Sequence, residues 1–480
     1  MKTLLVTISI ATFQLFNFCQ AQINLVGMSS HGGFGNHGTL FSVSTTGTVD
    51  TLYNFNSGLN GCSPMGGMVL ANDGNLYGFT ASCGSNAAGT LIRYNPHTKA
   101  VTTLVDFSLT IGGGPMGDLV LGSDGDLYGM TNAGGTNNDG TIFKCTTSGV
   151  LTVMVQFNGT NGANPLGSLR QGKDGNFYGM TRFGGPSNKG SIFQFSPSFS
   201  ALKTIHTFSG ADGAEPLASL TFIHDSVMYG LTYDGGAYNG GVIFYCTTSG
   251  KYRMLSSLSS TTGIFPFGSL INGKDGYLYG TAFYGGTNYY GTLFRCNDSG
   301  VVNVLANFTD TNGGYPEGTL TLASDGKFYG TASHGGNMTS VAGVVFCYDR
   351  SNSTLKDVVQ FDGTGPDMPQ GTLMEMNNTT TTGENIVAVN TANVSLYPNP
   401  NKGEFTLEVK NNENATASIQ KENVKLEVYN TVGEMVHTEN LQSNQQQSTI
   451  NLGSEPAGVY IYKVMSDNSG MLANGKFVIE

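Results

Sequence analysis

The sequence predicts an all-β protein: a seven-bladed β-propeller with four strands per blade, followed by a small C-terminal Ig-like β-sandwich. A phrase of the form "DGxLYGxTxxGG" recurs at intervals of 50 or 51 residues. The seven copies are centred on Val26, Tyr77, Tyr128, Tyr178, Tyr229, Tyr279 and Tyr329. Each copy contains four short apolar segments separated by turn residues, and none has helical periodicity. Four strands in a repeat of about 50 residues are typical of a propeller blade.

The four segments of a copy can be followed in order. The first comes after Pro-x-Gly, as in "PLGSL" at 165–169, and the second is "LYGMT". The third is "GTIF", and the fourth ends on Phe, as in "LTVMVQF" at 151–157. Asp-Gly pairs join the first two segments, for which we expect type I′ turns because Asp-Gly tolerates positive φ. A β-solenoid is the competing architecture, but it prefers shorter repeats and does not need repeated hairpins.

Two features of the array depart from a simple repeat. Asp225-Ser226 replaces Asp-Gly in one copy, so we expect a less ideal turn there. The array also begins in a second segment, "INLVGM", and ends with an additional first segment, "MPQGTLMEM" at 368–376. Residues 368–376 are therefore expected to close the blade that residues 23–55 begin, which leaves no free sheet edge.

The first 21 residues read as a secretory signal peptide: one Lys, a short apolar stretch and a small residue at Ala21. Lipid attachment at Cys19 is the alternative, but "FNF" before it lacks the small residue that such sites need. No later run is long and apolar enough to predict a transmembrane span. We therefore expect residues 22–376 to form an exported propeller.

Composition excludes one class of partner and indicates how the cysteines are used. The net charge is -11 and no Lys/Arg-rich run occurs, so nucleic-acid binding is not expected. Cys62 and Cys83 lie nearly opposite each other across the hairpin at Asp73-Gly74, and a disulfide between them suits an oxidising compartment. Four further cysteines occupy apolar packing positions and are expected to be buried thiols. They are Cys145, Cys246, Cys296 and Cys347.

The chain changes character after the repeats. Residues 377–393 read as a polar linker, and residues 394–480 have the alternating apolar pattern of a small β-sandwich. This last segment resembles the type A C-terminal sorting domain of the Bacteroidetes type IX (Por) secretion system. The resemblance rests on Tyr397, Pro398, Asn399, Pro400, Gly403, Gly458, Val459, Tyr460 and Lys476. It implies passage through the periplasm, handling by the type IX machinery and surface attachment or release; an ordinary Ig-like appendage is the alternative.

The repeats resemble the Gloeo_Verruco (GloVer) tandem repeat of secreted bacterial proteins, over residues 23–376. The matching pattern is "DGxLYGxTxxGGxxxxGTIF". This resemblance carries no known chemistry, and it implies only fold and location.

Candidate ligand-binding residues lie on the loops that follow the second segment. The residue before the Gly pair differs between copies while the frame stays constant, as in binding surfaces built on a scaffold. Aromatic side chains also concentrate on these loops, where they suit sugar faces and peptide surfaces; packing between blades is the alternative for each ring. The candidates are His31, Phe34, Phe183, Tyr233, Asp234, Tyr238, Tyr284, Tyr289, Tyr290 and His334.

No motif predicts a catalytic centre, a metal or a cofactor. HExxH, paired CxxC, GxSxG and P-loop patterns do not occur. Gly33, Gly35 and Gly38 have GxGxxG spacing, but a strand follows them where a dinucleotide site needs a helix. His31, Cys83 and His334 fall on consecutive blades, which lie too far apart to share a zinc ion with ligands about 2.0–2.3 Å from the metal.

The residues leave three functions open. The favoured hypothesis is a surface or extracellular binding module for a glycan or a protein. A secreted glycan hydrolase or lyase with its carboxylates on the loop face is the second, and a purely structural surface protein is the third. Carboxylates converging on one pocket would favour the enzyme, and scattered aromatic side chains would favour binding.

Overall fold

The computed structural model describes residues 23–58, 60–336, 342–376, 393–397, 402–410, 424–430, 434–441, 447–466 and 470–479. The predicted signal peptide therefore lies outside the described residues. The chain divides into two compact units, Met1–Asn378 and Thr379–Glu480.

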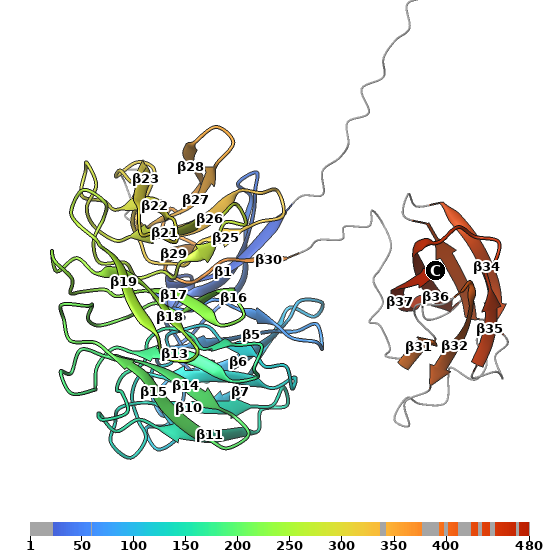
Figure 1. The fold of residues 1–480 in the computed structure, drawn as a ribbon, viewed down its shortest axis with the longest axis horizontal. Coiled ribbons are helices and arrows are strands. Elements are labelled where there is room, and N and C mark those ends of the chain that lie inside the picture. The colour runs from blue at the N-terminus through green and yellow to red at the C-terminus, as the bar shows by residue number, and fades with distance from the viewer. Residues whose placement is uncertain are drawn as a thin grey trace, which may run out of the picture. The chain divides into compact units, whose positions relative to one another are not determined.

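The first unit is built from seven antiparallel sheets, and its one short helical turn among the described residues is η1 (Phe34–Asn36) (Figure 1). Six of the sheets follow one another along the chain. Sheet 2 contains β4 (Val69–Leu70), β5 (Leu76–Thr80), β6 (Thr90–Asn95) and β7 (Ala100–Asp106). Sheet 3 contains β8 (Val120–Leu121), β9 (Leu127–Thr131), β10 (Thr141–Cys145) and β11 (Leu151–Gln156). Sheet 4 contains β12 (Arg170–Gln171), β13 (Phe177–Thr181), β14 (Ser191–Ser196) and β15 (Ala201–Thr207).

The next three sheets repeat this order. Sheet 5 contains β16 (Thr221–His224), β17 (Val227–Leu231), β18 (Val242–Thr247) and β19 (Tyr252–Ser257). Sheet 6 contains β20 (Ile271–Asn272), β21 (Leu278–Ala282), β22 (Thr292–Cys296) and β23 (Val302–Asn307). Sheet 7 contains β24 (Gly314–Pro316), β25 (Thr321–Leu322), β26 (Phe328–His334), β27 (Val344–Asp349) and β28 (Thr354–Gln360).

Sheet 1 joins the two ends of the array. It contains β1 (Asn24–Gly32), β2 (Thr39–Ser44), β3 (Val49–Asn54), β29 (Pro366–Pro369) and β30 (Met374–Met376). In Figure 1 the orange β30 lies beside the blue β1, and Val26 pairs with Met374. The predicted pairing of the last repeat segment with the first strand is therefore confirmed.

Each sheet packs on the next through a shared apolar core, and sheet 7 packs on sheet 1. Leu25 and Phe41 of sheet 1 lie in one cluster with Tyr329 and Val345 of sheet 7. Six other clusters join sheets 1 to 7 in consecutive pairs. The four cysteines predicted to be buried thiols lie inside these clusters, and all four are free and buried.

The Asp-Gly turns differ from the predicted type I′ geometry. In the turn before β5, the N–H of Gly74 donates to the carbonyl of Ala71, and only Gly74 has a positive φ, of 76°. This is a three-residue loop with glycine in the left-handed region, not a two-residue type I′ turn. Asp73 keeps a negative φ because its carboxylate accepts a hydrogen bond from the N–H of Asn75, 3.1 Å away. At Asp225-Ser226 the hairpin has a register shift, as expected for a less ideal turn.

The repeated "LYG" has a packing role at both of its last two residues. The Tyr128 hydroxyl donates to the Asp124 carboxylate at 2.8 Å, and the same Tyr–Asp bond recurs in four other sheets. Gly129 leaves room for aromatic rings, because a Cβ there would lie 2.7 Å from Phe143 and 2.8 Å from Phe79. The phrase is therefore scaffold.

The second unit contains two antiparallel sheets that share one core. One sheet has β31 (Asn393–Tyr397), β32 (Glu404–Lys410) and β35 (Gln447–Asn451). The other has β33 (Val424–Tyr429), β34 (Met435–Leu441), β36 (Gly458–Ser466) and β37 (Gly470–Ile479). Phe405 and Ile450 of the first sheet pack with Val428, Val464 and Phe477 of the second.

Candidate functional site

Seven Pro-x-Gly segments, one for each sheet, line one shared cavity. We call them the Pro-x-Gly ring; they are residues 64–66, 115–117, 165–167, 216–218, 266–268, 316–318 and 369–371. A Cβ on Gly117 would lie 2.5 Å from the carbonyl oxygen of Gly167, and a Cβ on Gly371 would lie 2.2 Å from that of Gly66. The last segment thus abuts the first, and the position admits almost no side chain. Ala218 is the one exception to glycine.

The residue after each ring glycine ties its sheet to the neighbouring sheet. The N–H of Ser168 donates to the Ser219 hydroxyl at 2.7 Å, and that of Ser219 donates to Ser269 at 2.9 Å. Gly67 has no side chain at this position, and Asp118 spans the gap. The Asp118 carboxylate accepts from the Gly67 N–H at 2.6 Å and from the Thr372 hydroxyl at 3.2 Å.

The ring encloses a cavity of about 240 Å³ to which all seven segments contribute. The middle residue of each Pro-x-Gly lines it, and these residues differ in chemistry. They are Met65, Met116, Leu166, Leu217, Phe267, Glu317 and Gln370. One side of the wall is therefore aliphatic and aromatic, and the other side carries a carboxyl and an amide.

Glu317 and Gln370 form the polar side of the cavity. Burial raises the pKa of Glu317, although the Ser333 and Gln370 side chains lie within hydrogen-bond reach of its carboxyl and oppose the shift. The Oε1 of Gln370 is buried and accepts no hydrogen bond from any described residue. The Oδ1 of Asp367, three residues earlier on β29, is also buried and accepts no hydrogen bond from any described residue. Buried acceptors without partners are rare in folded proteins and need an explanation.

An arc of aromatic rings extends from the cavity across sheets 5, 6 and 7. Phe267 contacts Tyr233 at 5.2 Å and Phe283 at 5.0 Å between ring centroids. Phe283 in turn lies 5.1 Å from Tyr315, which lies 4.9 Å from His334. We call this set the aromatic arc; it contains Tyr233, Phe265, Phe267, Phe283, Tyr284, Tyr290, Tyr315 and His334.

The residue before each ring proline is held in an unusual conformation. All seven have φ between 51° and 61°, a region that favours glycine, yet six are not glycine. They are Ser63, Gly114, Asn164, Glu215, Phe265, Tyr315 and Met368. Backbone outliers of this kind cluster at functional sites. Here two of them contribute Phe265 and Tyr315 to the arc.

The polar groups beside the arc are arranged in pairs. The Arg182 Nη2 lies 2.9 Å from the Glu215 carboxylate, and the guanidinium lies 4.6 Å from the Phe183 ring centroid. The Ser333 hydroxyl donates to the carbonyl of Tyr315 at 3.1 Å and lies 3.0 Å from Nδ1 of His334. Burial lowers the pKa of His334, although the Asp367 carboxylate opposes this shift.

The structure brings together some of the predicted ligand residues and separates others. Tyr233, Tyr284, Tyr290 and His334 belong to the aromatic arc. Phe183 lies under Arg182, and the Asp234 carbonyl accepts a backbone bond from Ala214. His31 lies on sheet 1, where its Nδ1 is 3.0 Å from the Ser30 hydroxyl.

Three exposed aromatic residues among these candidates make no ring contact with the arc. They are Phe34, Tyr238 and Tyr289, with 85%, 67% and 63% of their surface exposed. Each lies in a loop beyond a Gly pair. Their grouping with the other candidates stays a prediction.

Sequence reasoning missed the cavity residues. Glu317, Gln370 and Phe267 belong to Pro-x-Gly segments, and Tyr315 and Phe265 directly precede two of these segments; none of the five is among the candidates predicted from the sequence. A signal was present: the middle residue of Pro-x-Gly is Met or Leu in four copies, so Glu and Gln there stand out.

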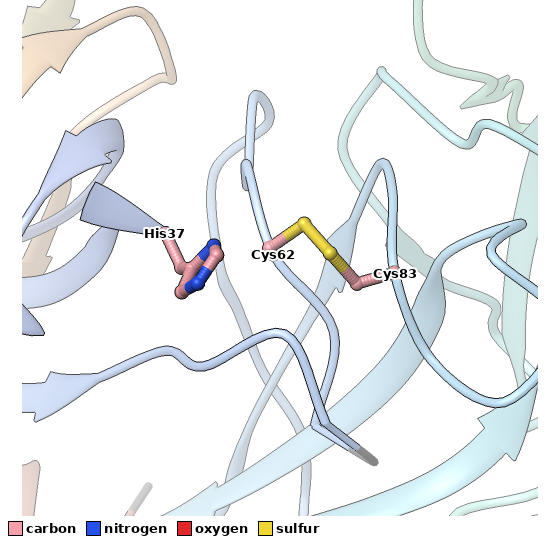
Figure 2. A group of neighbouring side chains, drawn as sticks. All are labelled: His37, Cys62 and Cys83. Atoms are coloured by element: carbon pink, nitrogen blue, oxygen red, sulfur yellow. A yellow bond between two sulfur atoms is a disulfide. The ribbon is translucent and has the colours of Figure 1, made fainter. Parts of the chain in front are cut away.

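Cys62 and Cys83 form the disulfide that the hairpin pattern predicts (Figure 2). His37 is not among the residues predicted from the sequence. Its imidazole lies beside the disulfide bond, within 4.8 Å of both sulfurs. A His with two cysteines suits zinc only when both sulfurs are thiolates. Because the sulfurs are bonded to each other, they are not available as metal ligands here.

The residues of the predicted sorting signal lie in the second unit. Tyr397 is at the end of β31, and Gly403 has a φ of 87° before β32. Gly458, Val459 and Tyr460 begin β36, where the Tyr460 hydroxyl donates to the Pro456 carbonyl at 2.7 Å. Lys476 pairs with Ile461 through the backbone. Pro398, Asn399 and Pro400 lie outside the described residues.

Comparison with known families decides what the two units are. Residues 17–244 and 222–388 match the model of the Gloeobacter/Verrucomicrobia repeat. The chain belongs to this repeat family. Residues 395–480 of the repeat protein match the secretion system C-terminal sorting domain of the Por type. Both resemblances inferred from the sequence are thereby confirmed, and the sorting domain implies type IX export to the cell surface or the extracellular space.

Solved structures similar to the repeat protein have low identity to it. A putative 6-phosphogluconolactonase from Bacteroides uniformis is 16% identical, with a TM-score of 0.51 over 74% of this chain and 100% of that chain. PorZ, a surface component of the type IX secretion system of Porphyromonas gingivalis, is 12% identical, with a TM-score of 0.41 over 92% of this chain and 63% of that chain. The first likeness concerns the fold alone. No curated protein matches the chain significantly.

Across the described residues, no helix has the length and apolar character needed to cross a membrane.

Proposed function

We propose that the repeat protein is an exported binding protein in which the seven sheets are the blades of a closed β-propeller. The domains would be a signal peptide at 1–21, the propeller at 22–376, a linker at 377–393 and an Ig-like sorting sandwich at 394–480. The abutting Pro-x-Gly segments and the seven inter-sheet cores support closure. The repeat and sorting families support a secreted bacterial protein, and we infer a Bacteroidetes source from the type IX system.

The route of the protein follows from the sorting domain. The signal peptide would direct the chain to the periplasm, and residues 394–480 would then be recognised by the type IX machinery at the outer membrane. Deleting residues 394–480 should strand the propeller in the periplasm, as measured by fractionation and surface proteolysis. Normal surface delivery of the truncated chain would refute this route.

The ligand site of the proposed binding protein is the Pro-x-Gly ring together with the aromatic arc. One observation carries this assignment: seven similar sheets place side chains of five different types, among them one carboxyl and one amide, around one cavity. A purely structural ring would repeat one packing solution, as the Ser and Thr residues after the ring glycines do. Small-molecule sites in proteins commonly combine an apolar cavity with a few convergent polar groups.

A matched pair of variants tests the site. Tyr284 is 38% exposed within the aromatic arc, and Phe199 is 83% exposed on the turn between β14 and β15. The full chain would be screened against glycan and peptide arrays, and the best ligand retested with Tyr284→Ala and Phe199→Ala. Affinity should fall about tenfold for Tyr284→Ala, as for truncation of an interface aromatic, and stay unchanged for Phe199→Ala. Equal retention by both variants would refute the location.

A carbohydrate-active enzyme is the second candidate, and Glu317 is the observation that favours it. A carboxyl with a raised pKa in an apolar cavity can act as a general acid. Release of reducing sugar from any polysaccharide by the full chain, abolished in Glu317→Gln, would establish the enzyme and overturn a function in binding alone.

A further inference from the structure

The cavity of the Pro-x-Gly ring has an unbalanced charge. Its wall contains two ionisable side chains, Asp118 and Glu317, and both are acidic. Asp118 already accepts hydrogen bonds from Gly67 and Thr372. Glu317 has only Ser333 and Gln370 within reach, and no lysine or arginine lines the described cavity. Glu317 is therefore an acidic group of the wall that has no cationic partner among the described residues.

One buried acceptor of the wall lacks a donor. Gln370 Oε1 has no hydrogen-bond partner among the described residues. Ser333 does not satisfy Gln370, because its hydroxyl is bonded to the Tyr315 carbonyl. An unmade hydrogen bond of this kind costs about 1–3 kcal/mol. A cationic ligand with N–H donors would satisfy Gln370 Oε1 and give Glu317 an oppositely charged partner.

The remaining wall suits a ligand that carries its positive charge at the end of an aliphatic stem. Met65, Met116, Leu166 and Leu217 present aliphatic surface opposite Glu317. Phe267 lies in the wall between Tyr233 and Phe283, and aromatic faces attract ammonium and guanidinium groups. The volume of about 240 Å³ is below the range of about 300–1,000 Å³ that holds drug-sized ligands. It therefore fits one extended side chain or one small amine.

We propose that the cavity binds an ammonium or guanidinium group on an aliphatic stem, with the head at Glu317 and Gln370 and the stem against the methionines and leucines. This proposal rests on the proposed function, in which the ring is the ligand site, and it names the chemical class of the ligand. The group can belong to a Lys or Arg side chain of a polypeptide or to a free aliphatic amine.

Calorimetry on the full chain distinguishes these ligands from neutral ones. The probes are n-pentylamine, blocked lysine and arginine (Nα-acetyl, C-terminal methylamide), a capped Gly-Gly-Lys-Gly-Gly peptide, and the neutral analogues n-pentanol and blocked norleucine. Binding of the cationic probes and not of the neutral ones is the expected result. Tighter binding of the peptide than of pentylamine assigns the ligand to a polypeptide, and equal binding assigns it to a small amine.

Two substitutions provide the decisive comparison. Glu317→Gln keeps the shape of the side chain and removes the charge, and it should weaken binding of the cationic probes at least about tenfold, as expected when one partner of a buried charge pair is removed. Asp357→Asn removes the same charge from the exposed outer strand of the same sheet and should leave binding unchanged. Thermal unfolding of both variants verifies that each is folded.

The outcomes separate this inference from the proposed function. Equal affinity for neutral and cationic probes, unchanged affinity in Glu317→Gln, or no binding of any cation at millimolar concentration would overturn the inference. If an array ligand is then still lost in Tyr284→Ala, the ring remains a ligand site for another chemistry. If no ligand depends on the aromatic arc, the proposed binding function fails as well.

Discussion

The hydrogen bond between Tyr128 and Asp124 offers a direct test of the scaffold, because the chain contains its own control. Tyr128→Phe keeps the buried ring and removes only the hydroxyl that donates to Asp124 at 2.8 Å. Burial, together with this bond, raises the pKa of Tyr128 to about 12. Tyr229 occupies the same position in sheet 5, where Ser226 stands in place of a glycine. Burial is the largest cause of the raised pKa of Tyr229, and no hydrogen bond contributes to it. Tyr229→Phe is therefore the matched control.

The expected cost follows from the exposure of the acceptor. Hydrogen bonds to charged groups contribute about 1.5–3 kcal/mol, but the Asp124 side chain is 43% exposed and water competes for it. We therefore expect Tyr128→Phe to lower the free energy of unfolding by about 1 kcal/mol, or about fivefold in the ratio of folded to unfolded protein. Tyr229→Phe should change it by less than about 0.5 kcal/mol.

Urea unfolding of the full chain, followed by circular dichroism, measures both values. The pH dependence adds a second criterion. Burial opposes ionisation of Asp124, but hydrogen bonds from Lys144 and Tyr128 hold its pKa below the usual value. A carboxyl with a lowered folded-state pKa stabilises the fold above its unfolded pKa and loses that contribution as pH falls. The difference between wild type and Tyr128→Phe should thus shrink below about pH 4; equal costs for the two Tyr→Phe variants would refute the reasoning.

Three further predictions concern closure, the disulfide and Glu317. Replacing Cys62 and Cys83 by alanine should lower stability by about 3 kcal/mol from loop closure over their sequence separation of 21, and an unchanged denaturation midpoint would contradict it. Deleting Met374–Met376 should expose the edge of β1 and cause dimerisation or aggregation visible by light scattering, whereas a monomer of wild-type stability would show that β30 is dispensable. Glu317→Gln should raise the melting temperature at pH 7 and have little effect near pH 4, because a raised carboxyl pKa means that stability is lost as pH rises; a uniform shift at both pH values would argue against this.

The scaffold could be predicted because its signals are local and repeated. The spacing of Tyr77, Tyr128 and Tyr178 sets the length of the repeat, and short apolar segments with turn residues set the strands. The geometry of the Asp-Gly turn could not be predicted, because Asp73 has a choice between positive φ and bonding the Asn75 N–H. The hydrogen bonds that Asp73 accepts from the Asn75 N–H and the Tyr77 hydroxyl decide it.

The site was less accessible from sequence for a physical reason. A residue before proline is normally biased to extended conformations, so nothing indicated that Phe265 and Tyr315 would have φ of 58° and join one arc. Residues in the arc come from separate segments of the chain: Phe283 lies 16 positions after Phe267, and Tyr315 lies 32 positions after Phe283. Only the packing of sheets 5, 6 and 7 on one another brings them together.

The contrast between two neighbouring ring positions separates scaffold from site. After the ring glycines, five of seven residues are Ser or Thr. The hydroxyls of Ser219, Ser269 and Thr319 accept the same hydrogen bond from a backbone N–H of the neighbouring sheet. The residue type is kept at this position because the packing of adjacent sheets requires it. At the middle of Pro-x-Gly, the backbone is equally constrained, yet the side chains range from Met65 to Phe267 and Glu317. Packing alone does not require a carboxyl opposite four aliphatic side chains, and burying one is costly. The loss of symmetry at this position, on a frame that keeps it elsewhere, is therefore the observation that supports the proposal of a ligand site in this cavity.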